Sequence, residues 1–358
     1  MRTFLRSFFA LQLLPALESA SEETLIGGQA VLEGVMMRSP HAWGIAVRKA
    51  TGEMATHCEP LDRPSEKRKW LAWPFVRGLV TLGQAMSLGF RALKFSANVL
   101  LAGLPQEEQK GKDKTPVSTA SETPKEAQVE KAPELSGWLI AINMLVSVAF
   151  FIFMYKFIPL LATTELNKSW SALGNNVLFN LVDGVIRLAL FLLFIWGISL
   201  FADIRRVYEY HGAEHKTVFA YEAKHDIPTI QYTQQFSTYH PRCGTSFLMT
   251  IMLISILVYA AFPITASGAR QGIFNHLFWY RFGLRVLLLP VIASVSYEMI
   301  RFSAKHGRSL FAILTKPGLW MQRITTKQPK DDQVECAIKA LDEAMTLEKT
   351  RGGELVIA

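Results

Sequence analysis

Charged residues are scarce in this sequence. Asp, Glu, Lys and Arg make up 19% of its 358 residues, against about 25% in a typical globular chain. The deficit lies in a few long uncharged runs, which excludes a simple soluble enzyme. The high share of hydrophobic residues, 50%, excludes a disordered chain. Cysteine is also rare: the chain has three, far apart in the sequence. Three cysteines are too few for a disulfide framework. They indicate a reducing compartment or a metal site.

Several common signatures are absent as well. The sequence contains no phosphate-binding loop, no Gly-x-Ser-x-Gly elbow, no dinucleotide-binding fingerprint and no evident internal repeat. The net charge of +8 is modest, and in a membrane protein it favours contact with anionic lipid over contact with nucleic acid. The lipid bilayer is therefore the expected partner, and no nucleic acid is expected.

Four stretches have the length and apolar character of membrane-spanning helices, which need about 20 apolar residues. The clearest is the third of them along the chain, residues 246–268, which is almost entirely apolar. The second also carries Asp183 and Arg187, which stand four residues apart and so share one helix face. We expect them to form a structural ion pair, with transport or proton relay as the alternative. The predicted spans cover residues 138–155, 177–202, 246–268 and 282–298.

The distribution of Lys and Arg predicts the orientation of these spans, because basic residues collect in cytoplasmic loops. Fifteen lie in residues 20–135, five in 203–245 and ten in 299–358, whereas 163–176 and 269–281 hold one and two. The three basic segments are therefore expected to be cytoplasmic, with both termini inside the cell.

The segments outside the spans differ in composition. Glycines and β-branched residues in 25–62, with a turn at 50–53, predict a small β-rich element. Between 70 and 104, aromatic residues alternate with basic ones and no uncharged run is long enough to span, so helices on the membrane surface or against the bundle are expected. Residues 105–136 have the composition of a disordered linker. Residues 331–349 have the apolar spacing of an amphipathic helix.

The first residues require a choice between two interpretations. Residues 1–17 hold a short apolar stretch, interrupted by Arg6 and Gln12, with no good cleavage site. We favour an interfacial amphipathic helix over a signal peptide, which would place the basic N-terminal region outside.

The expected fold class is mainly α: a polytopic membrane protein with about four transmembrane helices and a small β-containing cytoplasmic N-terminal element. The predicted order is an interfacial segment (1–24), a β-rich element with amphipathic helices (25–104), a linker (105–136), the first two spans (137–202), a cytoplasmic His/Cys loop (203–245), the last two spans (246–300) and a cytoplasmic tail (301–358).

Side chains able to do chemistry gather in the segment 203–245. His211 and His215 stand four residues apart, the spacing with which two histidines on one helix face bind a metal ion. Glu214 completes a His-x-x-Glu-His pattern, the inverted zincin arrangement, in which a glutamate beside the ligands activates water. Gly212 lowers helix stability by about 1 kcal/mol relative to Ala, so this interpretation depends on the segment being helical.

His240 and Cys243 lie in a second part of the same segment, within His-Pro-Arg-Cys. Two kinds of metal site are open. A closed structural site would use four ligands, namely His211, His215, His240 and Cys243, whereas a catalytic site would use three and leave a position beside Glu214. In the absence of any metal, the same side chains would form a hydrogen-bonded cluster that orders the loop.

Three further acidic residues are candidates for the same site, although each is expected to be structural. Glu33 lies between glycines in a tight stretch, and Glu222 follows the histidine motif. Glu298 ends the fourth span on the cytoplasmic side, where it can face the site.

Five blocks of this sequence carry a resemblance to a known family: IGGQAVLEGVMMRSP at 26–40, DIRRVYEYHGAEHKT at 203–217, HPRCGTSFL at 240–248, LLLPVIASVSYEMIR at 287–301 and PGLWMQRITTKQP at 317–329. In this order they resemble the bacterial YqhQ-like membrane proteins, described as a domain of unknown function and as predicted metal-dependent enzymes. The resemblance covers about 25 to 347 and implies a multi-pass protein of the bacterial inner (cytoplasmic) membrane. The long linker and the N-terminal apolar stretch depart from the compact family pattern.

The function that these features favour is a membrane-embedded, zinc-dependent enzyme, a hydrolase acting at the cytoplasmic interface. His211 and His215 would bind the metal with Cys243 or His240, Glu214 would be the general base, and Arg242 would stabilise an anionic intermediate. The alternative is a non-catalytic membrane scaffold or biogenesis factor whose His/Cys cluster is a structural clip. The substrate or protein partner is left open, as is a homo-oligomer.

Overall fold

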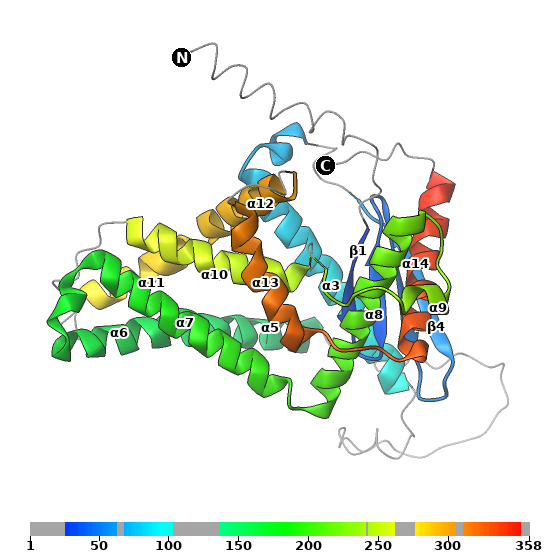
Figure 1. The fold of residues 1–358 in the computed structure, drawn as a ribbon, viewed down its shortest axis with the longest axis horizontal. Helices are drawn as coiled ribbons and strands as arrows, with labels where there is room; N and C mark the ends of the chain where they lie inside the picture. Colours follow the sequence, from blue (N-terminus) through cyan, green and yellow to red (C-terminus); the bar gives the residue numbers. More distant parts are fainter. Residues whose placement is uncertain are drawn as a thin grey trace, which may run out of the picture.

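The structure, a computed structural model, describes residues 26–62, 68–102, 137–240, 243–261, 276–305 and 311–351. Three predictions lie outside these residues: the interfacial segment 1–24, the linker 105–136 and the position of Arg242. The chain is mainly helical and forms two parts (Figure 1). We call the sheet with α8, α9 and α14 the cap, and we call the helices α5–α7 and α10–α13 the bundle.

The cap is built on a four-stranded antiparallel sheet in the order β1-β2-β3-β4. The predicted β-rich element is therefore confirmed, and its last turn brings the backbone of Lys49 and Gly52 together at 50–53. The strands are β1 (Gly27–Val31), β2 (Gly34–Arg38), β3 (Ala42–Arg48) and β4 (Met54–Pro60).

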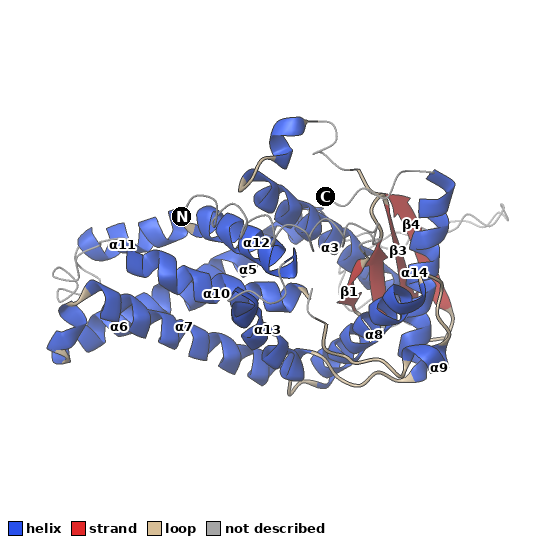
Figure 2. Ribbon diagram, turned by 45° about the horizontal axis from the view of Figure 1, so that its top comes forward, coloured by secondary structure: helices blue, strands red, loops and turns tan. Residues whose placement is uncertain are grey.

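Helices cover both faces of this sheet (Figure 2). Successive side chains of a strand point to opposite faces, so Val35 and Met37 pack against α8 (Ala202–Lys224) and α14 (Asp331–Arg351). Met36 instead packs with Leu88 of α3 (Val76–Ala102) on the other face. This arrangement explains why β2 and β3 are apolar almost throughout. It also shows that α3, in the region expected on the membrane surface or against the bundle, packs both on the sheet and against α12 of the bundle. Helix α14 confirms the predicted C-terminal helix.

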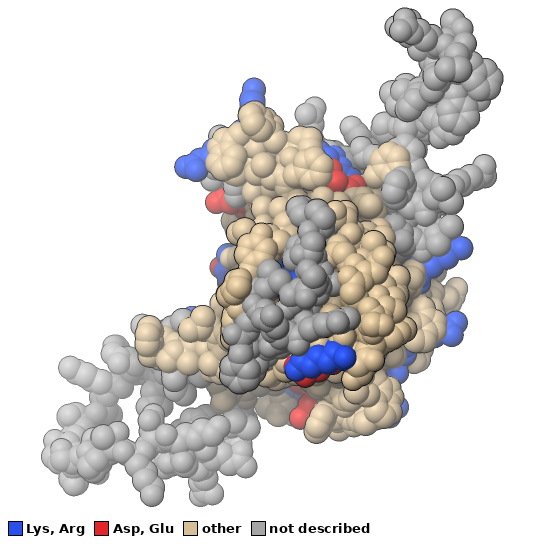
Figure 3. Space-filling model, turned by 90° about the vertical axis from the view of Figure 1, so that its left-hand side faces the viewer, with Lys and Arg blue, Asp and Glu red and all other residues tan. Residues whose placement is uncertain are grey.

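The remaining elements form the bundle and its connections. They are η1 (Lys69–Ala72), α5 (Gly137–Ile152), η2 (Phe153–Phe157), α6 (Ile158–Ser169), η3 (Ser171–Gly174), α7 (Asn176–Ile198), α9 (Ile230–Thr233), α10 (Gly244–Ala261), α11 (His276–Leu287), α12 (Leu289–Lys305) and α13 (Phe311–Thr325). Figure 3 shows the end of the molecule that carries α6 and α11, and most of the described surface there is formed by uncharged residues.

By length and composition, three helices among the described residues can cross a membrane: Ile142–Ser169, Asn176–Ile198 and Gly244–Ala261. A fourth span is obtained if the bent pair Phe278–Leu287 and Leu289–Phe302 is counted as one, and its halves meet at 41°. About four spans were predicted, so the structure supports three or four.

Two boundaries differ from the sequence-based expectation. The first helix does not end near 155 but continues through a π-helical turn to Ser169, so the expected loop from 163 is partly helical. The prediction of one continuous helix over 282–298 was wrong, because the helix is interrupted at Leu288. Pro290 explains the break, since a proline ring clashes with the carbonyl four residues earlier.

The C-terminal tail also differs from expectation. Residues 301–358 contain α13 in addition to α14, and α13 packs closely along α10. A side chain at Gly318 of α13 would meet Ser246 of α10. Part of the predicted tail therefore belongs to the bundle, where it also approaches the segment 203–245.

A buried ionic group holds the bundle together. Arg187 donates a hydrogen bond to Asp183, as the spacing predicted, and Arg285 of α11 also donates to Asp183. Arg285 further donates to the Asn180 side chain at 2.8 Å, and Arg187 donates to the Ser255 hydroxyl at 2.7 Å. All three charged side chains are almost completely buried. The group thus fixes α7, α10 and α11 relative to one another.

We predict that Asp183→Asn strongly destabilises the bundle, because it leaves two buried guanidinium groups without their counter-ion. Breaking a buried ion pair costs about 3–5 kcal/mol. The matched control is Glu165→Gln, which removes the half-exposed ion pair with Lys168 and should cost about 0–1 kcal/mol. Thermal unfolding in detergent compares the two, and equal losses would contradict this account of the ionic group.

A second ionic contact ties α14 to the sheet. The Glu348 carboxylate accepts hydrogen bonds from the Ser39 hydroxyl at 2.6 Å and from the His41 backbone at 2.8 Å. Burial alone would raise the pKa of Glu348, but the hydrogen bonds from Ser39 and His41 outweigh it and leave the pKa below its usual value.

This contact predicts a pH-dependent loss of stability. A lowered pKa in the folded state stabilises the fold above the unfolded-state pKa, and this contribution disappears as the pH falls through the folded-state pKa. Glu348→Gln should therefore cost about 1–3 kcal/mol at pH 7, and the difference from wild type should shrink below about pH 4.5. Denaturant unfolding of wild type and variant, at pH 7 and again below about pH 4.5, measures this difference in unfolding free energy. A difference that does not change with pH would contradict the role given to the Glu348 carboxylate.

Candidate metal centre

Helix α8 carries the histidine motif on one face. The predicted helix over His211 and His215 is confirmed, because α8 runs without a break from Ala202 to Lys224. His215 is 1% exposed and Glu214 is 7% exposed. Gly212 does not interrupt the helix. Its missing side chain instead leaves the space in which the Lys327 carbonyl oxygen lies, and the Lys327 amide donates to the Tyr208 carbonyl at 2.9 Å.

Cys243, just before α10, completes a compact group with the two histidines. Its sulfur lies 3.3 Å from His211 Nε2 and 3.1 Å from the Thr245 hydroxyl. One potential ligand atom from each of His211, His215 and Cys243 lies within 4.8 Å of the others. Residues from two separate segments of the predicted His/Cys loop therefore meet at one point.

Backbone carbonyls orient both imidazole rings. His211 Nδ1 lies 2.9 Å from the Thr325 carbonyl and His215 Nδ1 lies 2.5 Å from the Thr238 carbonyl. Since a carbonyl only accepts, each Nδ1 carries the proton, and each Nε2 keeps a lone pair in the neutral ring. This is the usual arrangement of histidine ligands, in which the other nitrogen donates to the protein.

The donor set fits a divalent cation such as zinc. Nε2 of His215 is buried and makes no hydrogen bond with the described residues, and a buried polar atom of this kind is normally satisfied by some partner. Burial also lowers the pKa of His215 and of His240 below the usual imidazole value. Both rings are therefore neutral near pH 7, which is the form that binds metal ions.

Glu214 lies beside this group. Its carboxylate is 3.9 Å from His211 Nε2. Burial raises the pKa of Glu214, while a hydrogen bond from the Gly28 backbone, and the rings of His211 and His240 when they are protonated, oppose that shift. A side chain at Gly28 of β1 would meet the Glu214 side chain at 2.8 Å, so this glycine is what lets the strand reach the carboxylate.

His240 lies next to the group without joining it. Its ring centre is 5.7 Å from that of His215 and 4.4 Å from that of Phe219, and its Nε2 is 3.7 Å from the Glu222 carboxylate. The Gln322 side chain of α13 holds the His240 backbone by two hydrogen bonds. It accepts one from the His240 amide and donates one to the His240 carbonyl, both at 2.8 Å. The structure therefore brings three of the four predicted ligands together.

The other acidic candidates lie elsewhere or have partners. Glu33, in the turn between β1 and β2 with φ +54°, accepts hydrogen bonds from Arg206 and anchors the hairpin to α8. Glu298 does not face the metal centre among the described contacts, since Arg77 of α3 binds it. Arg242, predicted to stabilise an anion, lies outside the described residues.

Several residues of the site were not singled out from the sequence. The carbonyls of Thr238 and Thr325 and the side chain of Gln322 orient the histidines. A backbone carbonyl has no signature in the sequence. The block 317–329, which contributed to the family resemblance, did mark the region of Gln322 and Thr325.

Gly212 offers a test of this packing. Gly212→Ala should push the Lys327 carbonyl away, release the Thr325 contact with His211 and destabilise the cap by about 1–3 kcal/mol. The control is Gly83→Ala in α3, where a side chain would meet nothing within 4 Å and the change should stabilise the helix by up to about 1 kcal/mol. Thermal unfolding compares the two variants, and a neutral Gly212→Ala would refute the close approach.

Comparisons with known proteins agree with the resemblance described above. A family model described as "Protein of unknown function (DUF1385)" matches residues 73–347. The chain is 31% identical over 324 residues, 90% of this chain and 92% of the relative, to the "Uncharacterized protein YqhQ" of Bacillus subtilis (strain 168). No solved structure matches the chain. The match over most of its length and the identity to YqhQ show that the chain belongs to the DUF1385 family of YqhQ-like proteins.

Proposed function

We propose that this protein is a metal-dependent enzyme, a hydrolase, that works where the cap meets the membrane-spanning bundle. One observation carries the proposal: the ligand atoms of His211, His215 and Cys243 lie within 4.8 Å of one another, with the carboxylate of Glu214 3.9 Å from His211 Nε2. Hydrolytic metal sites typically have three protein ligands, a free coordination position and a nearby carboxylate that can act as a general base.

Zinc is the metal that this donor set favours. Two imidazole nitrogens and one cysteine sulfur combine borderline and soft donors, which suit Zn²⁺ better than the oxygen-preferring Mg²⁺ or Ca²⁺. Bound there, zinc would supply Lewis-acid chemistry, polarising a carbonyl or phosphoryl group and making water more acidic.

The protein side chains would have separate roles. His211, His215 and Cys243 would hold the metal, and the Thr325 and Thr238 carbonyls would keep the two rings in position. Glu214 would take a proton from the attacking water and return it to the leaving group. In keeping with the sequence analysis, Arg242 is assigned to the stabilisation of negative charge that develops on the substrate.

The spans would place this chemistry at the membrane surface. Three residues separate the end of α7 from the start of α8, and Cys243 immediately precedes α10. The candidate metal centre therefore lies at the start of one apolar helix, α10, and its histidines lie on the helix that follows another, α7. With the excess of Lys and Arg in 20–135, 203–245 and 299–358, this favours a multi-pass protein of the bacterial inner membrane, with the cap and both termini in the cytoplasm.

A structural role is the second candidate, and one observation favours it. His240 is close to His215, with ring centres 5.7 Å apart, so a rotation of one side chain would add a fourth ligand. A site with four protein ligands is closed and stabilises a fold without catalysing a reaction. The protein would then be a membrane scaffold or biogenesis factor.

Metal content tests the ligand assignment. Purified protein, loaded with zinc and dialysed, should retain about one ion per chain. His215→Ala should lose most of it, whereas Glu214→Gln should keep it. His225→Asn is the matched control, because His225 is exposed at the end of α8 with φ +54°, a conformation that Asn tolerates. Wild type without retained zinc would refute both metal-based functions.

A measurement of bacterial fitness then distinguishes a catalytic metal site from a structural one. Alleles encoding Glu214→Gln and His215→Ala are competed against the wild-type allele in the native host. Loss of a general base lowers a rate by about 10²–10⁴-fold, so an enzyme should lose its function in both variants. If Glu214→Gln matches wild type while His215→Ala fails, the site is structural.

A further inference from the structure

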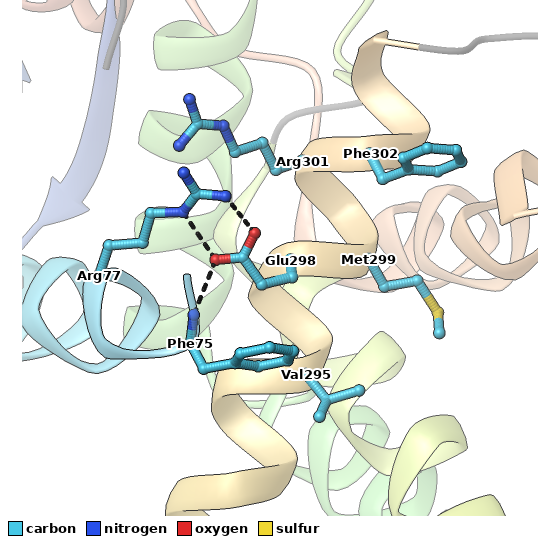
Figure 4. A pocket seen from close by; sticks show the side chains of 7 residues that line it. All are labelled: Phe75, Arg77, Val295, Glu298, Met299, Arg301 and Phe302. Carbon is cyan, nitrogen blue, oxygen red and sulfur yellow. Dashed lines mark hydrogen bonds and ion pairs between the residues drawn. The ribbon is translucent and has the colours of Figure 1, made fainter. Parts of the chain in front are cut away.

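A pocket separate from the metal centre lies between the start of α3 and the second half of α12 (Figure 4). It has a volume of about 570 Å³ and is open on one side. One part of its wall is charged and is formed by Arg77, Glu298 and Arg301. The rest is apolar and is formed by Phe75, Val295, Met299 and Phe302. Its lining thus combines cationic and apolar surface in one small space.

The charged wall is held in place by close helix packing. Gly78 of α3 lies against Tyr297 of α12, where a side chain would meet the tyrosine Cβ at 2.9 Å and the first ring carbon, Cγ, at 3.1 Å. This approach lets Glu298 accept two hydrogen bonds from Arg77, one of them at 2.7 Å. The Phe75 backbone amide donates to the same carboxylate at 3.2 Å.

Phe75 is held in an unusual backbone conformation. Its φ is +68°, in a region that bulky side chains rarely adopt and that costs about 1–3 kcal/mol. The bond to Glu298 holds the backbone there and keeps the ring on the pocket wall. Strained residues of this kind cluster at ligand-binding sites.

The pocket has an excess of positive charge. Two guanidinium groups face one carboxylate, and that carboxylate is already engaged with Arg77. Arg301 forms no hydrogen bond within the described part of the chain, and its guanidinium lies on the same side of Glu298 as that of Arg77 (Figure 4). A planar guanidinium binds phosphate oxygens with paired hydrogen bonds. The charged wall therefore suits a phosphate group.

The apolar wall and the surroundings indicate the source of that phosphate. Helix α12 is the second half of the broken span, which ends at Phe302. Trp70 and Trp73, a few residues before Phe75, are 51% and 65% exposed, and Phe302 is 46% exposed. Exposed Trp side chains are typical of the boundary between lipid and water. A free phosphate would use only the charged wall.

We infer that this pocket binds the headgroup of an anionic phospholipid, with the phosphate at Arg301 and Arg77 and the upper acyl chain against Val295, Met299 and Phe302. Basic pockets beside membrane spans bind such headgroups on the cytoplasmic side. No residue of the pocket belongs to the metal centre, so the two proposals stand or fall separately.

Lipid titration of the full-length protein tests the inference. The protein in neutral detergent is titrated with phosphatidylglycerol or with phosphatidylcholine of the same acyl chains, and bound lipid is counted by native mass spectrometry. Phosphatidylglycerol should bind at least about tenfold more tightly. Arg301→Gln should remove most of this preference, and Arg301→Lys should keep part of it. Arg205→Gln is the matched control, because its side chain is 69% exposed on α8, and it should change binding less than about twofold.

Two results would overturn the inference. Equal binding of the two lipids by wild type would exclude a site selective for an anionic headgroup, which is what is inferred here, and this comparison needs no variant to fold. Competition by glycerol phosphate at the concentration at which phosphatidylglycerol binds would show that the apolar wall contributes nothing and that the site takes a free phosphate. A photoreactive phosphatidylglycerol that labels residues 295–302 would support it, and labelling confined to other helices would contradict it.

Discussion

The burial of one face of α8 is the constraint on which the rest of this structure depends. Three residues separate the helix from the end of α7, and it is packed against β1, β2 and α14. On its remaining side, the chain after α13 passes so close that only glycine fits at position 212. Because the helix is held from these directions, Glu214 and His215 are buried and His211 is largely so. The same packing that forms the core of the cap therefore sets the positions of two of the three candidate metal ligands, His211 and His215, and Cys243 joins them from the residue before α10.

Much of this arrangement could be predicted because it is local in sequence. Helical spacing placed His211 and His215 on one face and Asp183 beside Arg187, and the apolar spacing of 331–349 gave α14. Glycines and β-branched residues indicated the sheet. The helical features depend on a period of 3.6 residues and the sheet on local composition, and a sequence shows both directly. The same is true of membrane spans, whose signal is simply the length of an apolar run.

The remainder depends on contacts between distant segments. Nothing near Asp183 indicates that Arg285, 102 residues later, is its second partner, and nothing marks the Thr325 carbonyl as the group that orients His211. The break at Leu288 is a different case, since Pro290 was visible in the sequence, but the apolar run around it outweighed the signal. In the metal centre, the spacing predicted which side chains share a helix face. It could not predict that His240 would turn towards Phe219 and Glu222 while Cys243 turned towards His211.

The candidate metal centre is consequently a product of the whole assembly. Its side chains come from α8 and from the residue before α10, and the carbonyls that orient them follow α9 and end α13. These segments meet only when the cap and the bundle have both formed. A buried ring nitrogen without a partner costs about 1–3 kcal/mol, and a cation bound at His215 Nε2, as proposed above, would remove that cost. A cation that binds only the folded chain stabilises it by mass action. Binding at this centre would therefore favour the one arrangement in which the spans, the sheet and α14 are all in place.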